Sequence, residues 1–245
     1  TRLNCDWLQL RCLGIGIACA LIMSCSNSIK SSSPLPLTPT ESLTSDNLSH
    51  LLIGEFSLQR GDSETATQRL LAVAQSTQDL DTAKRATYLA QFSQNPHLLQ
   101  QTSLLWSQLS PQDPLPWQYM AQAASLIGQF NQATLALEQE LKRGGGAGLP
   151  YIASLSINDT VATQANLQTT LLSWLDTYPN HKQLLLALAL LAQHSEQSET
   201  AIIYTGKALA QDTHYLQAQV VYGELLLASQ QTEAADTYLS QYTQP

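Results

Sequence analysis

An all-α fold, built as a succession of antiparallel helix pairs, is predicted for this 245-residue chain by three observations. Hydrophobic residues make up 44% of the sequence, with only 11 Gly and 10 Pro, while Ala, Leu and Gln are abundant. Such a composition favours helices with a sizeable core. Apolar residues recur three and four positions apart, which is the period of one helical face. Finally, these segments come in pairs separated by short breaks at Gly or Pro.

The clearest helix pair lies in residues 117–141. Its first helix places the bulky Trp117 and the small Ala121 on one face, because positions three and four apart are neighbours on a helix. Gly128 supplies the backbone freedom of a helix end, and Ala133 restarts the same period in a second helix. The small residues allow the two helices to approach closely, while the bulky ones fill the space between this pair and the next.

This spacing resembles the tetratricopeptide repeat, whose pattern is W-x2-L-G-x2-Y followed by A-x3-F. The matching positions here are Trp117, Met120, Ala121 and Ala124, then Ala133 and Leu137. The resemblance implies a right-handed superhelical solenoid of antiparallel helix pairs, whose first helices line a concave protein-binding groove.

Weaker matches on both sides extend the repeat to about five and a half copies over residues 46–245. The expected copies are Asp46–Thr77, Asp79–Ser110, the Trp117 pair followed by the glycines of 144–148, Leu149–Tyr178, Lys182–Asp212, and a sixth that begins at Tyr222 and includes Ala235. Neighbouring pairs in such an array bury a continuous core between them.

The N-terminal residues have the layout of a secretory signal. Arg2 and Arg11 precede an apolar run over residues 12–23. Twelve such residues are fewer than the roughly 20 that span a bilayer, so the alternative of a membrane-spanning helix is disfavoured. We therefore expect residues 1–24 to be a signal peptide.

The run ends in Leu21-Ile22-Met23-Ser24-Cys25, which resembles the lipobox of bacterial lipoproteins. The resemblance implies cleavage before Cys25 and acylation of that cysteine, and Ser26 in the next position favours the outer membrane. After Cys25, residues 26–45 are rich in Ser, Thr and Pro, which is typical of a flexible tether. At about 3.1 Å per residue the tether reaches about 60 Å.

Charge and motifs exclude several function classes. The formal charge is −8 without a basic run, so we expect no nucleic-acid partner. All four cysteines lie within residues 1–25, and the five histidines are scattered, in surface or capping roles. The glycines of 144–148 lack the following GK[ST] of a phosphate-binding loop, and Glu138 and Glu140 are expected on a solvated helix face. The prediction is a protein without enzymatic activity, cofactor, metal or small-molecule substrate.

The candidate binding residues come from the family's groove positions, carried onto the first helices of repeats two, three and five. They are amide, aromatic and aliphatic groups with one pair of cations, suited to a protein segment: Lys84, Arg85, Tyr88, Gln91, Phe92, Gln118, Tyr119, Gln122, Leu126, Gln183, Leu186, Leu190 and Gln193. In the alternative, Leu186 and Leu190 belong to the core, and Lys84 and Arg85 form a solvated face. As groove residues, the two cations would receive carboxylates of a partner.

Lipobox, tether and repeats together resemble the tetratricopeptide outer-membrane lipoproteins of Gram-negative bacteria. The blocks LLIGEFSLQRGDSETA and AKRATYLA are most similar to the adaptors that bind a periplasmic C-terminal processing protease and deliver cell-wall hydrolases to it. The resemblance implies an exported scaffold, lipid-anchored at the periplasmic face of the outer membrane, with an envelope protease, cell-wall hydrolases or secretion and pilus components as partners. The alternatives are a pilotin-like assembly factor for type IV pili and an envelope enzyme acting on peptidoglycan.

Replacing the expected lipidation site, Cys25→Ala, should leave an unprocessed precursor without an acyl chain, while the helical array folds unchanged. Metabolic labelling with a radioactive fatty acid measures this directly. Label that persists in the Cys25→Ala protein would show that another residue carries the lipid.

Overall fold

The computed structural model describes residues 44–229 and residue 238, and every regular element in this part is an α-helix. This confirms the predicted all-helical solenoid. The expected signal peptide, Cys25, residues 26–43 of the expected tether and Ala235 lie outside the described residues. The last two residues of the predicted tether are part of the array, because Thr44 caps α2 and Ser45 is its first residue. The helices are α2 (Ser45–Gln59), α3 (Ser63–Thr77), α4 (Leu80–Ala90), α5 (Pro96–Leu109), α6 (Leu115–Leu126), α7 (Phe130–Lys142), α8 (Gly148–Ser156), α9 (Val161–Trp174), α10 (Lys182–His194), α11 (Ser198–Gln211) and α12 (Leu216–Ala228).

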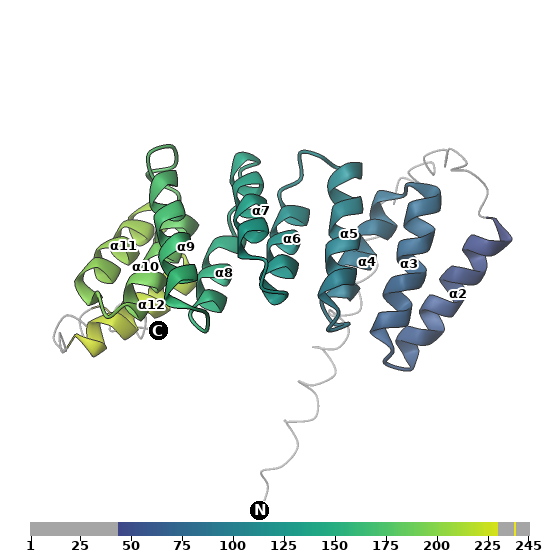
Figure 1. Ribbon diagram of the computed structural model, residues 1–245, viewed down its shortest axis with the longest axis horizontal. Helices are drawn as coiled ribbons and strands as arrows, with labels where there is room; N and C mark the ends of the chain where they lie inside the picture. The colour runs from purple at the N-terminus through teal and green to yellow at the C-terminus, as the bar shows by residue number, and fades with distance from the viewer. Residues whose placement is uncertain (1–43, 230–237, 239–245) are drawn as a thin grey trace, which may run out of the picture. The chain divides into compact units, whose positions relative to one another are not determined.

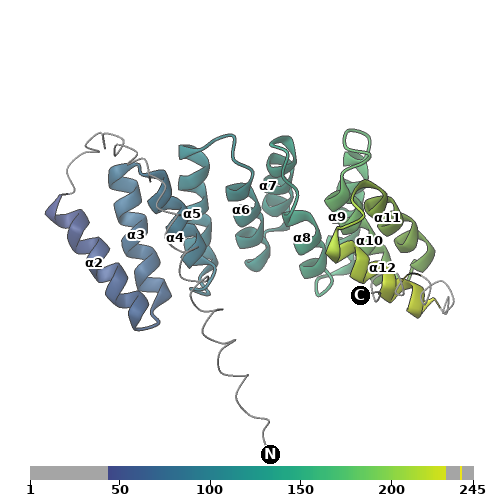
Figure 2. The ribbon, with the colours of Figure 1, turned by 180° about the vertical axis from the view of Figure 1, so that it is seen from behind.

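Consecutive helices lie side by side, as both views of the ribbon show (Figures 1 and 2). We call α2, α4, α6, α8, α10 and α12 the first helices of their repeats, and α3, α5, α7, α9 and α11 the second helices. Helices α3 and α5 each pack on both the helix before them and the helix after them. Helix α7 packs on α6 but makes little contact with α8. None of the helices in the described part is long and apolar enough to cross a membrane.

The helix starts follow from the local sequence. Asp62 caps α3 by accepting a hydrogen bond from the Thr65 amide at 2.9 Å, and Asp79 caps α4 through the Thr82 amide at 2.7 Å. Asn95 caps α5, whose first residue is Pro96, a residue that needs no intrahelical donor at that position. Polar side chains thus satisfy the amides that a helix start leaves without partners.

The turn inside a repeat uses one residue with positive φ, placed two positions before the second helix begins. That residue is Gly61, Gln94, Gly128 or Glu196, with φ between 53° and 79°. Glycine adopts this conformation without strain, whereas Gln94 and Glu196 bear a steric cost. Repeat four is the exception, because α9 begins at a Thr160 cap and no residue of its turn has positive φ.

The core of repeats one to three is centred on Trp106 of α5, which is fully buried. Its indole nitrogen donates to the Asp113 carboxylate at 3.0 Å, and its ring lies 5.6 Å from that of Tyr88 and 5.9 Å from that of Tyr119. Small residues such as Ala83 and Ala123 surround it and keep the helices close. A single large side chain therefore fills the space between α4, α5 and α6.

Repeat four departs from the regular packing. Its first helix, α8, has nine residues and packs more extensively on α10 and α6 than on its own partner, α9. In α9 only Leu167 and Leu171 are buried. The position of α8 therefore depends on contacts other than those of a regular helix pair.

Removing the Trp106 side chain, Trp106→Ala, should lower the free energy of unfolding by about 3–5 kcal/mol, because it leaves a cavity and removes the hydrogen bond to Oδ2 of Asp113. Leu104→Ala on the same helix removes a side chain that is 44% exposed and should cost less than about 1 kcal/mol. Urea unfolding followed by circular dichroism compares the two variants. Equal losses would contradict the central role of Trp106.

Candidate functional site

The predicted groove residues of repeats two and three meet at an aromatic patch, formed by Tyr88, Trp106 and Tyr119. The rings of Tyr88 and Tyr119 are 6.0 Å apart in an edge arrangement, which aromatic pairs prefer over a face-to-face sandwich. Tyr88 is 42% exposed, whereas Tyr119 is buried beneath it, and this burial raises the pKa of the Tyr119 hydroxyl. The Gln91 amide donates to the Gln122 side chain at 3.3 Å and so links α4 to α6.

The two predicted cations lie next to this patch but already have partners within the chain. The guanidinium of Arg85 forms an ion pair with Glu55 of α2. The ammonium of Lys84 lies 5.7 Å from the centre of the Trp106 ring, within the range of a cation–π interaction. Both side chains remain accessible, so a partner's carboxylate would compete with Glu55 for Arg85. Phe92, just after α4, is 73% exposed.

The other predicted residues lie on α6 and α10. Gln118 is half-buried near Gly148, the first residue of α8. Gln183 and Gln193 are half-buried at the two ends of α10, Leu126 is 53% exposed, and Leu186 is buried. Leu190 is half-buried and packs partly against the core. The sequence-based assignment of these residues to a binding surface stays a prediction.

Leu186 and Leu190 line an apolar groove on the first helices α8, α10 and α12. It encloses about 480 Å³. All its lining residues are uncharged: Ala147, Pro150, Tyr151, Ser154, Leu186, Leu190, Leu216, Gln217, Val220 and Val221. Leu216 is 69% exposed and Val220 53% exposed, so the wall formed by α12 presents aliphatic carbon to solvent. At the start of α10, Lys182 is paired with Asp212 at 2.5 Å, so its charge is already compensated.

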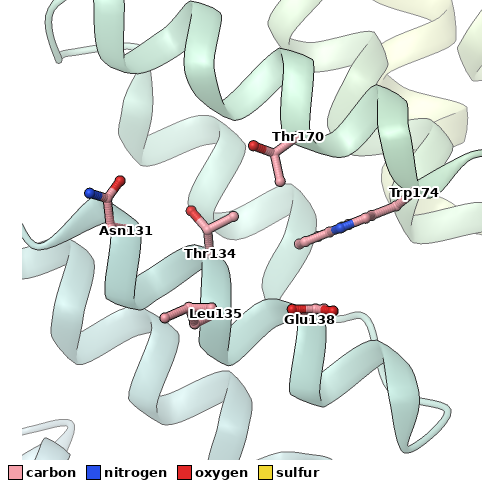
Figure 3. Close-up of a pocket in the computed structure, with 6 residues that line it drawn as sticks. All are labelled: Asn131, Thr134, Leu135, Glu138, Thr170 and Trp174. Carbon is pink, nitrogen blue, oxygen red and sulfur yellow. The ribbon is translucent and has the colours of Figure 1, made fainter.

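A second cavity lies between the second helices α7 and α9, which contact each other only sparsely. Figure 3 shows Thr170 and Trp174 of α9 facing Asn131, Thr134, Leu135 and Glu138 of α7 across a cleft of about 370 Å³. Glu138 is paired with Lys142 at 2.7 Å. None of the residues predicted for binding lines this cleft.

Glu140 corrects the sequence analysis, which placed it on a solvated helix face. Its side chain is 1% exposed, and its Oε1 accepts hydrogen bonds from the amides of Gly146 at 2.8 Å and Gly148 at 3.1 Å. Its Oε2 is buried and has no hydrogen-bond partner. Burial raises the pKa of Glu140 to about 7, against the opposite effect of the backbone donors Gly148, Gly146 and Ala147.

At three glycines around Glu140 there is no room for a side chain. A Cβ on Gly148 would lie 2.6 Å from Oε2 of Glu140, and one on Gly145 would lie 2.7 Å from its Cγ. A Cβ on Gly146 would overlap the ring of His181. We call Glu140, the glycine loop Gly144–Gly148 and His181 the glycine clasp.

His181 closes the clasp from the side of α10. Its Nδ1 accepts from the Leu184 amide at 3.4 Å and caps α10, so Nε2 carries the proton and donates to the Gly145 carbonyl at 3.0 Å. Burial lowers the pKa of this imidazole. The capping role predicted for the histidines is thus correct at His181. The run of glycines four residues after Glu140 was the signal for the clasp, since such a run leaves room for a buried side chain.

With this geometry, the chain has the architecture of a helical-repeat protein of the tetratricopeptide type. No protein-family profile matches it. It is 27% identical over 161 residues to the TPR repeat-containing protein PA4667 of Pseudomonas aeruginosa, a match that covers 66% of this chain. The chain spans about a quarter of that relative's length, with 27% covered.

Solved structures with a similar arrangement of helices are distant in sequence from this chain. TTC0263 of Thermus thermophilus is 14% identical, with a TM-score of 0.46 over 74% of this chain and 99% of that one. A tetratricopeptide repeat protein of Parabacteroides merdae is 9% identical, with a TM-score of 0.45 over 80% of this chain and 78% of that one. MamA of Desulfovibrio magneticus is 14% identical, with a TM-score of 0.40 over 82% and 94%.

Replacing both cations of the aromatic patch, Lys84→Ala with Arg85→Ala, should lower the free energy of unfolding by less than about 1 kcal/mol. The ion pair between Arg85 and Glu55 is exposed, and such pairs contribute little. Tyr119→Ala, which removes the buried ring beneath Tyr88, should cost several times more. Urea unfolding of the three proteins tests the difference, and a large loss in the double variant would make the cations structural.

Proposed function

We propose that this chain is a non-catalytic scaffold of the cell envelope, lipid-anchored through Cys25, that binds other proteins on its first helices and recruits a protease or cell-wall hydrolases. The observation that carries the proposal is the apolar groove between α8, α10 and α12, whose lining residues are uncharged and include exposed aliphatic side chains. Isolated surface leucines are common, but a hollow lined by several of them is typical of an interaction site.

The groove favours a partner segment that presents aliphatic or aromatic side chains without charge. A charged side chain placed there would lose its hydration without gaining an opposite charge from the lining. Arg85 and Lys84, some repeats away, would receive a carboxylate elsewhere on the same partner, in exchange for the contact of Arg85 with Glu55. In this proposal the apolar contact supplies most of the affinity and the cations contribute orientation.

The likeness to the Pseudomonas aeruginosa repeat protein supports the scaffold class. The adaptor role, the envelope location and the lipid anchor rest on the lipobox and the sequence blocks of the first repeats. Protein binding is the usual role of tetratricopeptide folds, and the recruitment of a protease or hydrolase is the specific form that we propose for this chain.

Site-specific photocrosslinking in intact cells tests the proposal. A benzophenone amino acid in place of Leu216, in the groove, should crosslink a protein partner, whereas the same probe in place of Val161 should not. Val161 is a matched control because it lies on the second helix α9 and is 80% exposed. Equal crosslinking at both positions, or none at Leu216, would refute binding in the groove.

The identity of the crosslinked protein separates the alternatives. A protease or cell-wall hydrolase supports the adaptor, while secretin subunits as the main product would instead support a pilus assembly factor. An enzyme acting on peptidoglycan is tested separately, by incubating the purified chain with cell-wall material. Released muropeptides would overturn the non-catalytic scaffold.

A further inference from the structure

The glycine clasp lies where the repeat packing is weakest and directly beside the apolar groove. Helix α8 packs on α10 and α6 but contacts α7 and α9 only sparsely, and its first residue, Gly148, donates its amide to Glu140 of α7. Ala147, between the two glycines that bind Glu140, also lines the groove. Pro150, Tyr151 and Ser154 of α8 form one wall of the same groove. A change in the clasp is therefore a change in the groove wall.

We propose that the glycine clasp is a proton-controlled latch: with a proton on Glu140 it holds α8 in the wall of the apolar groove, and loss of that proton opens it. This proposal rests on the proposed function in one respect only, because the apolar groove is the surface that opening of the latch would change. The latch itself is a property of residues 140–181 and needs no partner.

The geometry makes the charged form of Glu140 costly in the closed clasp. A carboxylate needs donors on both oxygens, and here only Oε1 has them, while Oε2 is buried without any. Glu140 is 1% exposed and its Oε2 is buried, so bulk water reaches this oxygen only after its surroundings are displaced. Opening the loop would hydrate both oxygens. Deprotonation therefore shifts the balance from the closed towards the open clasp.

No charged side chain on the packed elements compensates Glu140. On α7 itself, Arg143 stacks 4.6 Å from the Trp117 ring and donates to the Pro111 carbonyl, and Lys142 is paired with Glu138. The side chains of α6 nearest to the clasp are Pro114 and Gln118, which are uncharged.

On the other elements the charges are likewise engaged elsewhere. Asp113, just before α6, accepts from the Trp106 indole, and Lys182 at the start of α10 is paired with Asp212. His181 is the titratable group in contact with the glycine loop, and its ring binds the Gly145 carbonyl rather than the carboxylate.

The pH window follows from the two titrating groups. The pKa of Glu140 is raised from 4.5 to about 7, so its stabilisation of the closed clasp is complete below 4.5 and is lost as pH rises through about 7. The pKa of His181 is lowered below 6.5, so its contribution is complete above 6.5 and is lost as pH falls through the lowered value. The clasp is most stable in slightly acidic solution.

Hydrogen exchange of the intact chain, resolved by segment and corrected for intrinsic rates, tests the latch. Between pH 6 and pH 8 the titration of Glu140 should raise the opening equilibrium of residues 144–156 about tenfold, as linkage predicts for a carboxyl that titrates near 4.5 when open and near 7 when closed. His181 acts in the opposite direction over this range, so the net rise in the wild-type chain should be smaller than about tenfold. Helices α4 and α5 provide the internal reference and should show no such change. If the opening equilibrium of α8, like that of α4 and α5, does not change with pH, the proposal is wrong.

Two variants assign the effect to Glu140. Glu140→Gln keeps the shape and the acceptor but removes the proton equilibrium of this residue, so the rise in α8 exchange between pH 6 and pH 8 should disappear, leaving the opposite dependence on His181. Glu138→Gln, on the same helix but paired with Lys142 at the surface, should retain the rise. Gly148→Ala places a Cβ against Oε2 of Glu140 and should give rapid exchange of α8 at every pH. A rise that persists in Glu140→Gln would also refute the latch.

The exchange experiment and the crosslinking experiment fail independently. If hydrogen exchange of α8 does not depend on pH, the latch is refuted, whether or not a protein binds the groove. An absence of crosslinks from Leu216 removes the scaffold proposal while the exchange profile of α8 remains as predicted. If both hold, crosslinking from Leu216 should be several-fold stronger at pH 6 than at pH 8 in the wild-type chain, and this preference for pH 6 should be lost in Glu140→Gln.

Discussion

Close approach of neighbouring helices is the constraint on which the repeat architecture depends. Ala66, Ala83, Ala121 and Ala201 are fully buried, each on a helix that packs against its repeat partner. A larger side chain at such a position would push the helix axes apart or force its neighbours out of their rotamers. The large side chains then fill the spaces that remain, as Trp106 does between three helices. Regular spacing between helices in turn sets the distance between exposed residues on successive first helices.

Repeat four relaxes this constraint, and the surfaces of functional interest gather around it. Its first helix is short, and its turn lacks the positive-φ residue of the other four described turns. Apolar packing of α8 on α7 and α9 is sparse, so α8 is held by its packing on α10 and α6 and, on the side of α7, by the hydrogen bonds of the glycine clasp. Hydrogen bonds to a titratable group respond to pH, whereas packing of methyl groups does not. An irregular repeat thus joins a cavity between second helices, a groove between first helices and a proton-sensitive contact.

Charge and apolar surface are separated along the first helices. The accessible cations of repeat two are engaged with Glu55 and with the Trp106 ring, and the lining of the apolar groove carries no charge. In a chain of formal charge −8, an uncharged groove avoids repelling acidic partners and selects for apolar side chains. In the scaffold that we propose, a partner would be recognised at two places by different physical means, one by burial of carbon and one by exchange of ion pairs.

The sequence by itself determined the helical repeats, because periodic apolar residues, Asp and Asn caps and turn glycines are local signals. It correctly predicted the helix break at Gly128, which depends on neighbours within a few residues. Only the tertiary structure decided which candidate residues share a surface, since Tyr119 and Tyr88 are on the same patch but only Tyr88 is exposed.

Glu140 shows most clearly that the local sequence does not determine the environment of a side chain. Its neighbours in sequence, Gln139 and Leu141, give no reason to bury a carboxylate, and a glutamate on a polar helix is usually solvated. Its burial comes from glycines further along the chain and from helices that fold back over it, with His181 closing the loop from another repeat. Local sequence fixes helices because their hydrogen bonds are local, whereas the environment of a side chain is fixed by segments that meet only after the chain has folded.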